Sequence, residues 1–241
     1  MKINRYFILG LSAFLAVSSA ASAATIVASH DNLVLNSQSS TVQDASGNIV
    51  VKYASNNIRK SWLKFDLTGQ NADYSQAGTI TLTLAANSSS DATFKLALYA
   101  LNDTGLTAPT WTEDTLTWNN APGNVANSGN TAQKNSLDAG ETTLLGTTAT
   151  IANNTPAGTS FEFNLTNLST YLQSDNTITV IAMSSSQTNA GPSFSFASSE
   201  NATEGWRPTL AFAQVPEPSA AALLTGLVAL MGVCMRSGRR R

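Results

Sequence analysis

Residues 61–67 read Ser-Trp-Leu-Lys-Phe-Asp-Leu, and apolar and charged side chains alternate from Leu63 to Leu67. Successive side chains of a β-strand point to opposite faces, so alternation of this kind is typical of a half-buried strand. We expect Leu63, Phe65 and Leu67 to face a core, with Trp62, Lys64 and Asp66 on the opposite face.

The same period-two pattern recurs on both sides of this stretch. We expect about ten short strands, including residues 26–28, 49–53, 79–84, 94–100, 142–151, 161–165, 177–183, 194–196 and 209–212. Residues 101–139 are loop-rich, and 167–173 could form one helical turn. Many short strands with little helix predict an all-β fold, an antiparallel β-sandwich of jelly-roll-like kind spanning residues 24–214 as one domain.

The two ends of the chain differ from this body. Residues 1–23 carry Lys2 and Arg5, an apolar run and small residues up to Ala23, which is typical of a cleaved signal peptide. Residues 215–241 begin with Val-Pro-Glu-Pro-Ser, continue as an apolar run to Met235 and end in four arginines. We expect one C-terminal membrane helix, short for a bilayer core of ~30 Å, with the arginines on the cytoplasmic side. An uncleaved N-terminal anchor and a buried terminal helix are the alternatives.

The segment 215–241 resembles the PEP-CTERM sorting signal in its Pro216-Glu217-Pro218 motif, its helix and its arginine cluster. The resemblance implies transient anchoring in the inner membrane, recognition and cleavage by an exosortase, and final location at the cell surface, in the outer membrane or in an extracellular polysaccharide matrix.

The net charge of the body differs from that of the whole chain. The chain has a net charge of −2, but six of its 13 Lys and Arg and one of its 15 acids lie in the terminal segments. The body therefore carries seven cations and 14 acids, a net charge of −7, which argues against nucleic-acid binding. The sole cysteine, Cys234, lies in the tail, and His30 is the sole histidine, so neither a disulfide nor a zinc site is expected in the body.

Two segments of the body are similar to the DNRLRE domain family. Residues 56–67 match its Asn-Arg-rich segment followed by an aromatic-Leu-basic-Phe-Asp strand, although Ser55, Asn57 and Lys60 depart from the family name's Asp, Arg and Glu. Residues 111–122 match its Trp-x-Glu-x-x-Leu-x-Trp-Asn-Asn-x-Pro segment, and residues 196–210 its closing pattern. The resemblance implies a jelly-roll-like sandwich related to modules that bind acidic polysaccharides such as alginate.

The residues themselves indicate a candidate binding site. Four of the body's seven cations fall between positions 52 and 64, beside an aromatic side chain. Arginine pairs with carboxylates in bidentate geometry, so this cluster could bind an acidic polysaccharide. The alternative is a set of solvated strand faces with cross-strand pairs. The candidate ligand-binding residues are Lys52, Arg59, Lys60, Trp62 and Lys64.

Other motifs favour structural roles. Trp111, Trp118 and Trp206 are interpreted first as residues that cap the sandwich, and as sugar platforms second. Glu113 with Asp114, or with Glu200 or Glu204, could form the paired carboxylates of a glycosidase, but neighbouring strand residues point apart and surface acids are the simpler interpretation.

No cofactor is expected, although Asp31, Asp44 or Asp73 could bind a structural Ca²⁺. The sequence thus predicts an exported, non-catalytic protein that binds polysaccharide. The alternatives are a structural or adhesive biofilm-matrix protein and, more weakly, a polysaccharide lyase or hydrolase.

Overall fold

The computed structural model describes residues 22–43, 47–54, 56–86, 93–102, 111–126, 130–185 and 191–215. Residues 23–215 form one compact unit, which is the body of the protein. Residues 1–21 of the expected signal peptide, the Pro216-Glu217-Pro218 motif and the expected C-terminal helix lie outside the described residues. Among the residues described, no helix is long and apolar enough to cross a membrane.

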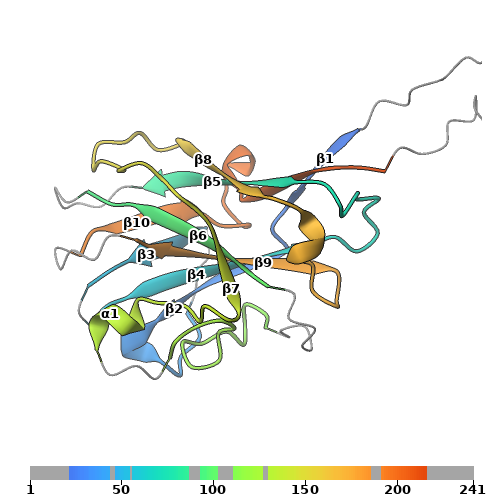
Figure 1. The fold of residues 1–241 in the computed structure, drawn as a ribbon. Coiled ribbons are helices and arrows are strands. Elements are labelled where there is room, and N and C mark those ends of the chain that lie inside the picture. The colour runs from blue at the N-terminus through green and yellow to red at the C-terminus, as the bar shows by residue number, and fades with distance from the viewer. Residues whose placement is uncertain are drawn as a thin grey trace, which may run out of the picture. The chain divides into compact units, whose positions relative to one another are not determined.

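The body is all-β, as predicted, and every strand pairing in it is antiparallel (Figure 1). The strands are β1 (Ala23–Val27), β2 (His30–Leu35), β3 (Asn48–Lys52), β4 (Arg59–Asp66), β5 (Gly78–Ala86), β6 (Leu96–Leu101), β7 (Thr142–Thr147), β8 (Ser160–Leu165), β9 (Thr177–Ser184), β10 (Ser193–Ala197) and β11 (Thr209–Ala213). The short helical turns are η1 (Asn36–Gln38), α1 (Thr131–Lys134), η2 (Leu168–Thr170) and η3 (Glu204–Trp206).

The two layers of the predicted sandwich belong to a single curled sheet. One half has the order β1-β11-β5-β8, and the other has β3-β4-β9-β6-β7 with β2 alongside β4. Strand β10 joins them, because it pairs with β3 along one edge and with β5 along the other. The body is therefore closed on the β10 side, and β7 and β8 end the two halves on the opposite side.

The main hydrophobic cluster lies between the two halves. Leu63, Phe65 and Leu67 are fully buried in it, as the alternation of residues 61–67 predicts. Ile80 and Leu82 of β5 contribute from the facing half. Burying a large apolar side chain contributes ~1.5–3 kcal/mol, so this cluster is the principal source of stability for a body without a disulfide.

Two local predictions differ in outcome. The helical turn expected within 167–173 is confirmed as η2, where the Asn167 side chain accepts a hydrogen bond from the backbone N–H of Thr170. Strand β2 was not expected as a separate strand, because the first strand was expected to start at Ile26 and Ala28 and His-Asp-Asn-Leu-Val-Leu does not alternate. Its residues from Asp31 to Leu35 are all buried, so both faces of this strand are covered and no alternation is required.

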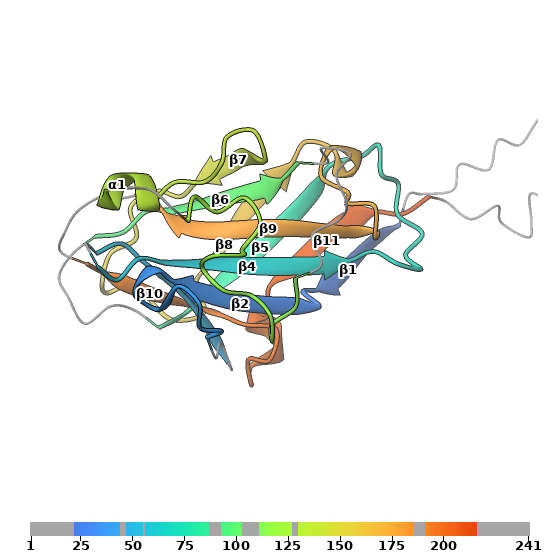
Figure 2. The same cartoon turned by 90° about the horizontal axis from the view of Figure 1, so that it is seen from below.

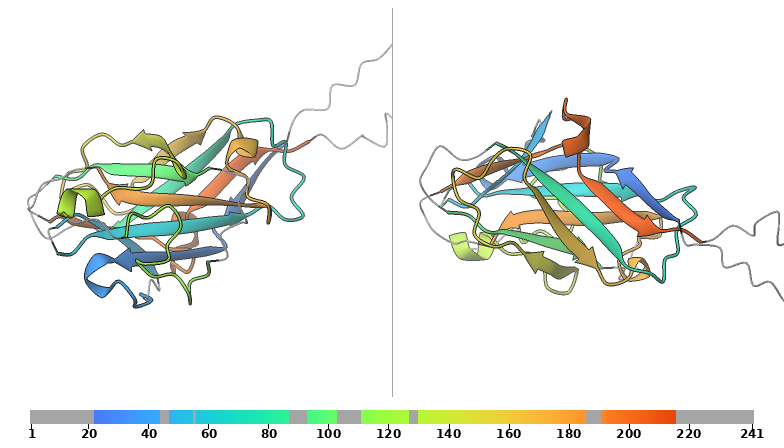
Figure 3. Two further views of the ribbon diagram at one scale, coloured as in Figure 1. Left: turned by 60° about the horizontal axis from the view of Figure 1, so that its bottom comes forward. Right: turned by 90° about the horizontal axis from the view of Figure 1, so that it is seen from above.

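The body has two distinct ends. Ala23 of β1 lies opposite Ala213 of β11, so the chain enters and leaves the body at the same end, called here the terminal end (Figure 3). β4 runs from Arg59 at the far end to Asp66, which pairs with Thr177 of β9. The far end is therefore where β3 and β9 finish and where β4 and β6 begin.

Candidate functional site

A long segment between β6 and β7 covers the outer face of β2, β4 and β9. We call its described residues, 111–126 and 130–141, the cap; its first part runs across β4 and β2 in Figure 2. A second hydrophobic cluster lies beneath it, separate from the main one. It contains Val34, Tyr53, Ile58, Trp62, Leu101, Trp111, Leu116, Trp118, Ala121 and Ile181.

Three of the five predicted ligand-binding residues are buried under the cap. Lys60 and Trp62 have no exposed surface, and Lys64 is 7% exposed. The alternation of residues 61–67 correctly assigns Trp62 and Lys64 to the face opposite Leu63 and Phe65. That face is covered by protein, so in this conformation these three side chains contact the cap and are out of reach of a ligand.

Each of the three side chains donates a hydrogen bond to the cap. The Nζ atom of Lys60 lies 2.8 Å from Asn124 Oδ1 and 2.6 Å from the carbonyl oxygen of Ser136. The Nε1 atom of Trp62 lies 3.0 Å from the carbonyl oxygen of Pro122. These bonds connect one strand of the sheet to two separate parts of the cap, because Asn124 and Ser136 lie on either side of α1.

The two lysines are also paired with tryptophans of the cap. The Nζ atom of Lys60 lies 4.8 Å from the centre of the Trp118 ring, and that of Lys64 lies 4.8 Å from the Trp111 ring. Lys64 Nζ donates a further bond of 2.8 Å to the Trp111 carbonyl. Trp111 and Trp118 are 5% and 2% exposed, so the structural interpretation of both residues is confirmed.

Burial changes the protonation of these lysines. It lowers the pKa of Lys60 to about 7, since water no longer stabilises the charged form. The ammonium group contacts neutral oxygens and the face of the Trp118 ring. Burial also lowers the pKa of Lys64, and the nearby carboxylates of Asp175 and Asp66 oppose this effect. The charge of Lys60 is therefore costly at neutral pH.

The remaining two predicted residues reach the surface together. Lys52, the last residue of β3, lies directly opposite Arg59, the first residue of β4. Both are partly exposed, and the Arg59 Nε atom lies 3.1 Å from Asn57 Oδ1. Neither forms an ion pair with a carboxylate in the part of the chain that the structure describes.

The same end of the body carries two further cations that sequence reasoning missed. Lys95 directly precedes β6, and its carbonyl accepts a 2.9 Å bond from the backbone N–H of Ser185, just beyond β9. Lys134 ends α1, and the side chain of the next residue, Asn135, donates a 2.9 Å bond to the carbonyl of Ser184. No local pattern reveals this grouping, since sheet topology alone brings positions 52, 59, 95 and 134 to one end.

We call Lys52, Arg59, Lys95 and Lys134 the cation end. They are four of the five cations in the described body that are at least partly exposed, the fifth being Arg207. Carboxylates occupy the terminal end instead: Asp66 closes β4, Asp73 lies in the turn before β5, and Asp175 precedes β9. The body is acidic as a whole, yet most of its exposed or partly exposed described cations lie at one end.

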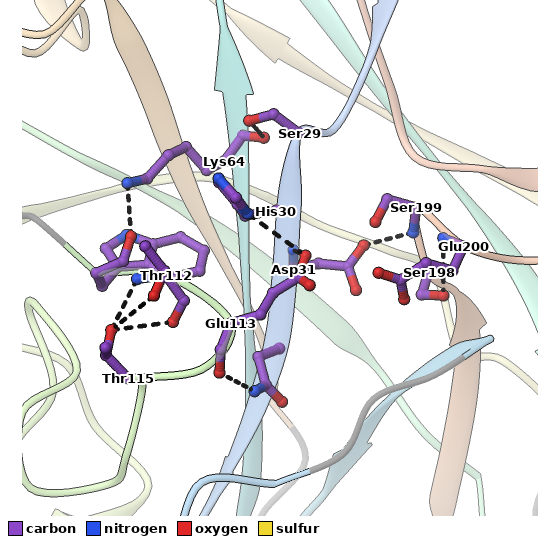
Figure 4. A network of polar contacts seen from close by, with 12 residues as sticks. Ser29, His30, Asp31, Lys64, Thr112, Glu113, Thr115, Ser198, Ser199 and Glu200 are labelled. Carbon is purple, nitrogen blue, oxygen red and sulfur yellow. Dashed lines mark hydrogen bonds and ion pairs between the residues drawn. The ribbon is translucent and has the colours of Figure 1, made fainter.

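A polar network connects Asp31, one of the candidate calcium ligands, with Glu113, one of the candidate catalytic acids (Figure 4). Asp31 is 1% exposed, and its Oδ2 atom accepts a hydrogen bond from the backbone N–H of Ser199. Glu113 Oε1 accepts a 2.9 Å bond from the backbone N–H of Asp31, and it lies 3.6 Å from His30 Nδ1. Glu113 thereby connects the start of the cap to β2, so this carboxylate has a structural role.

The protonation of Asp31 is also abnormal. Burial raises its pKa to about 7, with smaller contributions in the same direction from Glu200 and Glu113, while the bonds from Ser199 oppose the shift. Its Oδ1 atom is buried and has no hydrogen-bond partner among the described residues. A neutral carboxyl group at this position is therefore favoured up to about pH 7.

The acidic side chains considered as catalytic or calcium-binding groups lie in different environments. Glu113 and Asp114 lie in a turn, with Glu113 half-buried and Asp114 exposed. Asp73 uses its Oδ1 atom to accept bonds from the backbone and hydroxyl of Ser75, and Asp44 lies outside the described residues. Within the described part of the chain, no three His, Cys, Asp or Glu side chains are grouped as metal ligands.

These features define a small all-β binding domain with a capped face and a cationic end. Residues 22–170 match the sequence model of carbohydrate-binding module family 96. The match covers more than half of the chain, which therefore belongs to this family. No curated protein matches the chain. Family membership indicates carbohydrate binding, and such modules are generally non-catalytic.

Proposed function

We propose that the chain is an exported, non-catalytic protein that binds an acidic polysaccharide of the cell surface or extracellular matrix through its cation end. The observation that supports this proposal is the gathering of Lys52, Arg59, Lys95 and Lys134 at one end of an otherwise acidic body. Carboxylate groups of a uronic-acid polymer would pair with these cations, and Arg59 offers bidentate geometry. The proposal involves no cofactor.

Lys60, Trp62 and Lys64 act indirectly in this proposal. They hold the cap on the sheet, and α1 with Lys134 belongs to the same segment of the chain. Changes at these three residues should therefore affect binding through the position of Lys134 and through stability. Of the five residues predicted from the sequence, Lys52 and Arg59 would contact the polysaccharide, and Lys60, Trp62 and Lys64 would position the cap.

Export rests on the two ends of the chain. The signal peptide expected in residues 1–23 would direct secretion. The PEP-CTERM-like segment 215–241 would anchor the protein in the inner membrane until an exosortase cleaves near Pro216-Glu217-Pro218. Both segments join the body at its terminal end, so neither connection occupies the cation end.

Affinity electrophoresis of the fragment 22–215 tests the binding proposal. Both hydrophobic clusters lie wholly within this fragment, so it retains a complete core of its own. We expect retardation in gels that contain alginate, and weakening of that retardation with added NaCl because exposed charges are screened. Each of Lys52→Ala, Arg59→Ala, Lys95→Ala and Lys134→Ala should weaken binding about two- to fivefold.

Arg207→Ala is the matched control. It removes the same single charge from a partly exposed site elsewhere, where Arg207 Nε donates to the carbonyl of Asn201. Thermal unfolding of every variant would show that the fold is retained. Equal loss of binding in Arg207→Ala and in the four cation-end variants would show that binding depends on net charge and not on the cation end. Unchanged mobility of the wild-type fragment in alginate gels would refute the proposal.

A further inference from the structure

The open side of the curled sheet contains a groove between two edge strands. β7 pairs only with β6, and β8 pairs only with β5, among the strands that the structure describes. Each strand therefore has a free edge, at which every second residue directs its backbone N–H and C=O groups away from the sheet. The groove lies along these edges, between residues 145–149 and 160–164, and has a volume of about 400 Å³.

Both apolar and polar side chains line this groove. Leu145 and Phe161 are half-buried and pack against the main hydrophobic cluster, and the Phe161 ring meets the Phe196 ring edge-on at 6.2 Å. Thr147, Ser160 and Asn164 add hydroxyl and amide groups. Along β8 these side chains alternate, with Phe161 on the core side and Ser160 and Asn164 on the outer side. A sugar lying across this edge would pack its C–H face on the apolar side chains and direct its hydroxyls to the polar ones.

Two of the polar lining residues are held in place by β5. Ser160 Oγ shares a 3.1 Å hydrogen bond with Thr83 Oγ1, and Asn164 Oδ1 accepts a 3.1 Å bond from Thr79 Oγ1. The amide Nδ2 group of Asn164 retains its donors, since no described residue accepts from it. Part of the lining is thus oriented before any ligand arrives, which lowers the entropic cost of binding.

Charge distinguishes this groove from the cation end. Its one charged lining residue is the exposed Glu162, and no lysine or arginine is among its lining residues. A polyuronate would be repelled here, whereas a neutral sugar would meet no electrostatic penalty and would find an acceptor for its hydroxyls.

A further β-strand does not fit between the two edges. A Cβ atom added at Gly146 of β7 would be in van der Waals contact with Phe163 Cδ1 of β8, at 3.5 Å, so the two halves of the sheet approach each other closely at the floor of the groove. An added strand would need about 4.8 Å to a neighbour on each side, and would have to push the halves apart. The geometry therefore favours a glycan lying along the groove over a peptide strand inserted into it.

We propose that the groove between β7 and β8 binds a neutral sugar residue, as a second carbohydrate site beside the cation end. The site extends the carbohydrate binding proposed above, and it has its own residues and ligand chemistry. A protein with both sites would bind acidic and neutral glycans independently and could connect them.

NMR titration of ¹⁵N-labelled fragment 22–215 with cellohexaose and with mannohexaose tests this second site. We expect amide shift changes in residues 145–149 and 160–164 with at least one of the two, and none at Lys52 and Arg59. Gly146→Val should fill the floor against Phe163 and weaken binding about tenfold. Phe161→Leu keeps the apolar packing but removes the ring, and it should weaken binding by a smaller factor. Thr25→Ala, an exposed change on β1, is the control and should have no effect.

Glu162→Gln separates the two sites by charge. It should leave neutral-sugar affinity within about twofold and allow oligouronates to cause shifts in the groove that are absent in the wild type. No shift with either hexaose, or shifts confined to the cation end, would overturn the groove proposal while alginate binding stayed intact. Concentration-dependent dimerisation that Gly146→Val abolishes would also overturn it, because the edges would then pair with another strand. Loss of alginate binding alone would leave the groove proposal standing.

Discussion

The ammonium group of Lys60 donates a 2.8 Å hydrogen bond to the side chain of Asn124, across the interface between β4 and the cap. The lysine has no exposed surface, and burial lowers its pKa to about 7. An unfolded chain binds this proton up to the ordinary lysine pKa of 10.5, so between about pH 7 and pH 10.5 the unfolded state holds more protons than the folded state.

Stability should therefore rise as the pH increases from about 7 toward 10.5, by up to ~1.4 kcal/mol per pH unit for this one group. Urea unfolding of the fragment 22–215 at several pH values measures this slope. Lys60→Met should reduce it, and the part that remains would come from Lys64, whose pKa burial also lowers. A slope unchanged by Lys60→Met would show that Lys60 is charged and compensated in the folded state.

Asp31 should produce the opposite slope at acidic pH. Its pKa is raised from 3.8 to about 7 in the folded state, so between these values the folded state holds more protons than the unfolded state. Stability should fall as the pH rises from about 4 to about 7, and it should be lowest near neutrality when both groups are considered. Asp31→Asn should flatten this acidic side and stabilise the protein at pH 8. Asp114→Asn, at an exposed turn, is the control and should leave the profile unchanged.

Gly123 lies in a turn of the cap that packs against β6, β7 and β9. Its φ is +72°, and a Cβ atom there would lie 2.7 Å from Thr142 Cγ2 and 2.9 Å from Leu101 Cδ2. Gly123→Ala should destabilise the protein by about 1–3 kcal/mol through backbone strain and this overlap. Gly69→Ala separates the two effects, because Gly69 has a similar φ of +74° but no atom near its Cβ position. Equal losses in the two variants would exclude a contribution from the overlap.

The tail yields a prediction that intact-mass spectrometry can check. If an exosortase cleaves near Pro216-Glu217-Pro218, the surface-located protein should begin near Ala24 and lack residues 220–241. Substitution of both prolines by alanine should keep the tail attached and retain the protein in the inner membrane. Recovery of the 220–241 peptide from surface-exposed wild-type protein would contradict the prediction.

Polarity alternation was a reliable guide to the strands and to their faces. It predicted β4, β5 and β8 and the inward side of each, because each strand has one face in the main cluster. It did not predict β2, which is covered on both faces. It also placed Trp62 and Lys64 opposite the core correctly, but a strand pattern cannot show whether the second face meets water or the cap.

The candidate site was only partly predictable for a related reason. Lys52 and Arg59 lie close in sequence, so their proximity could be anticipated. Lys95 and Lys134 are far from them along the chain. Lys95 joins the same end because β6 begins beside the end of β9. Lys134 joins it because the next residue, Asn135, donates a hydrogen bond to the carbonyl of Ser184 at the end of β9. The burial of Lys60 was equally hidden, since its partners Asn124 and Ser136 lie more than 60 residues away.

The pairing of Ala23 with Ala213 has a practical consequence. Directly opposed residues of antiparallel strands are about 5 Å apart, so the first and last strands of the body could be joined to the two sides of a single loop in a host protein. The domain could then be transplanted as an insertion, or immobilised on a bead through both ends at once, with the cation end and the β7–β8 groove still accessible to glycans in solution.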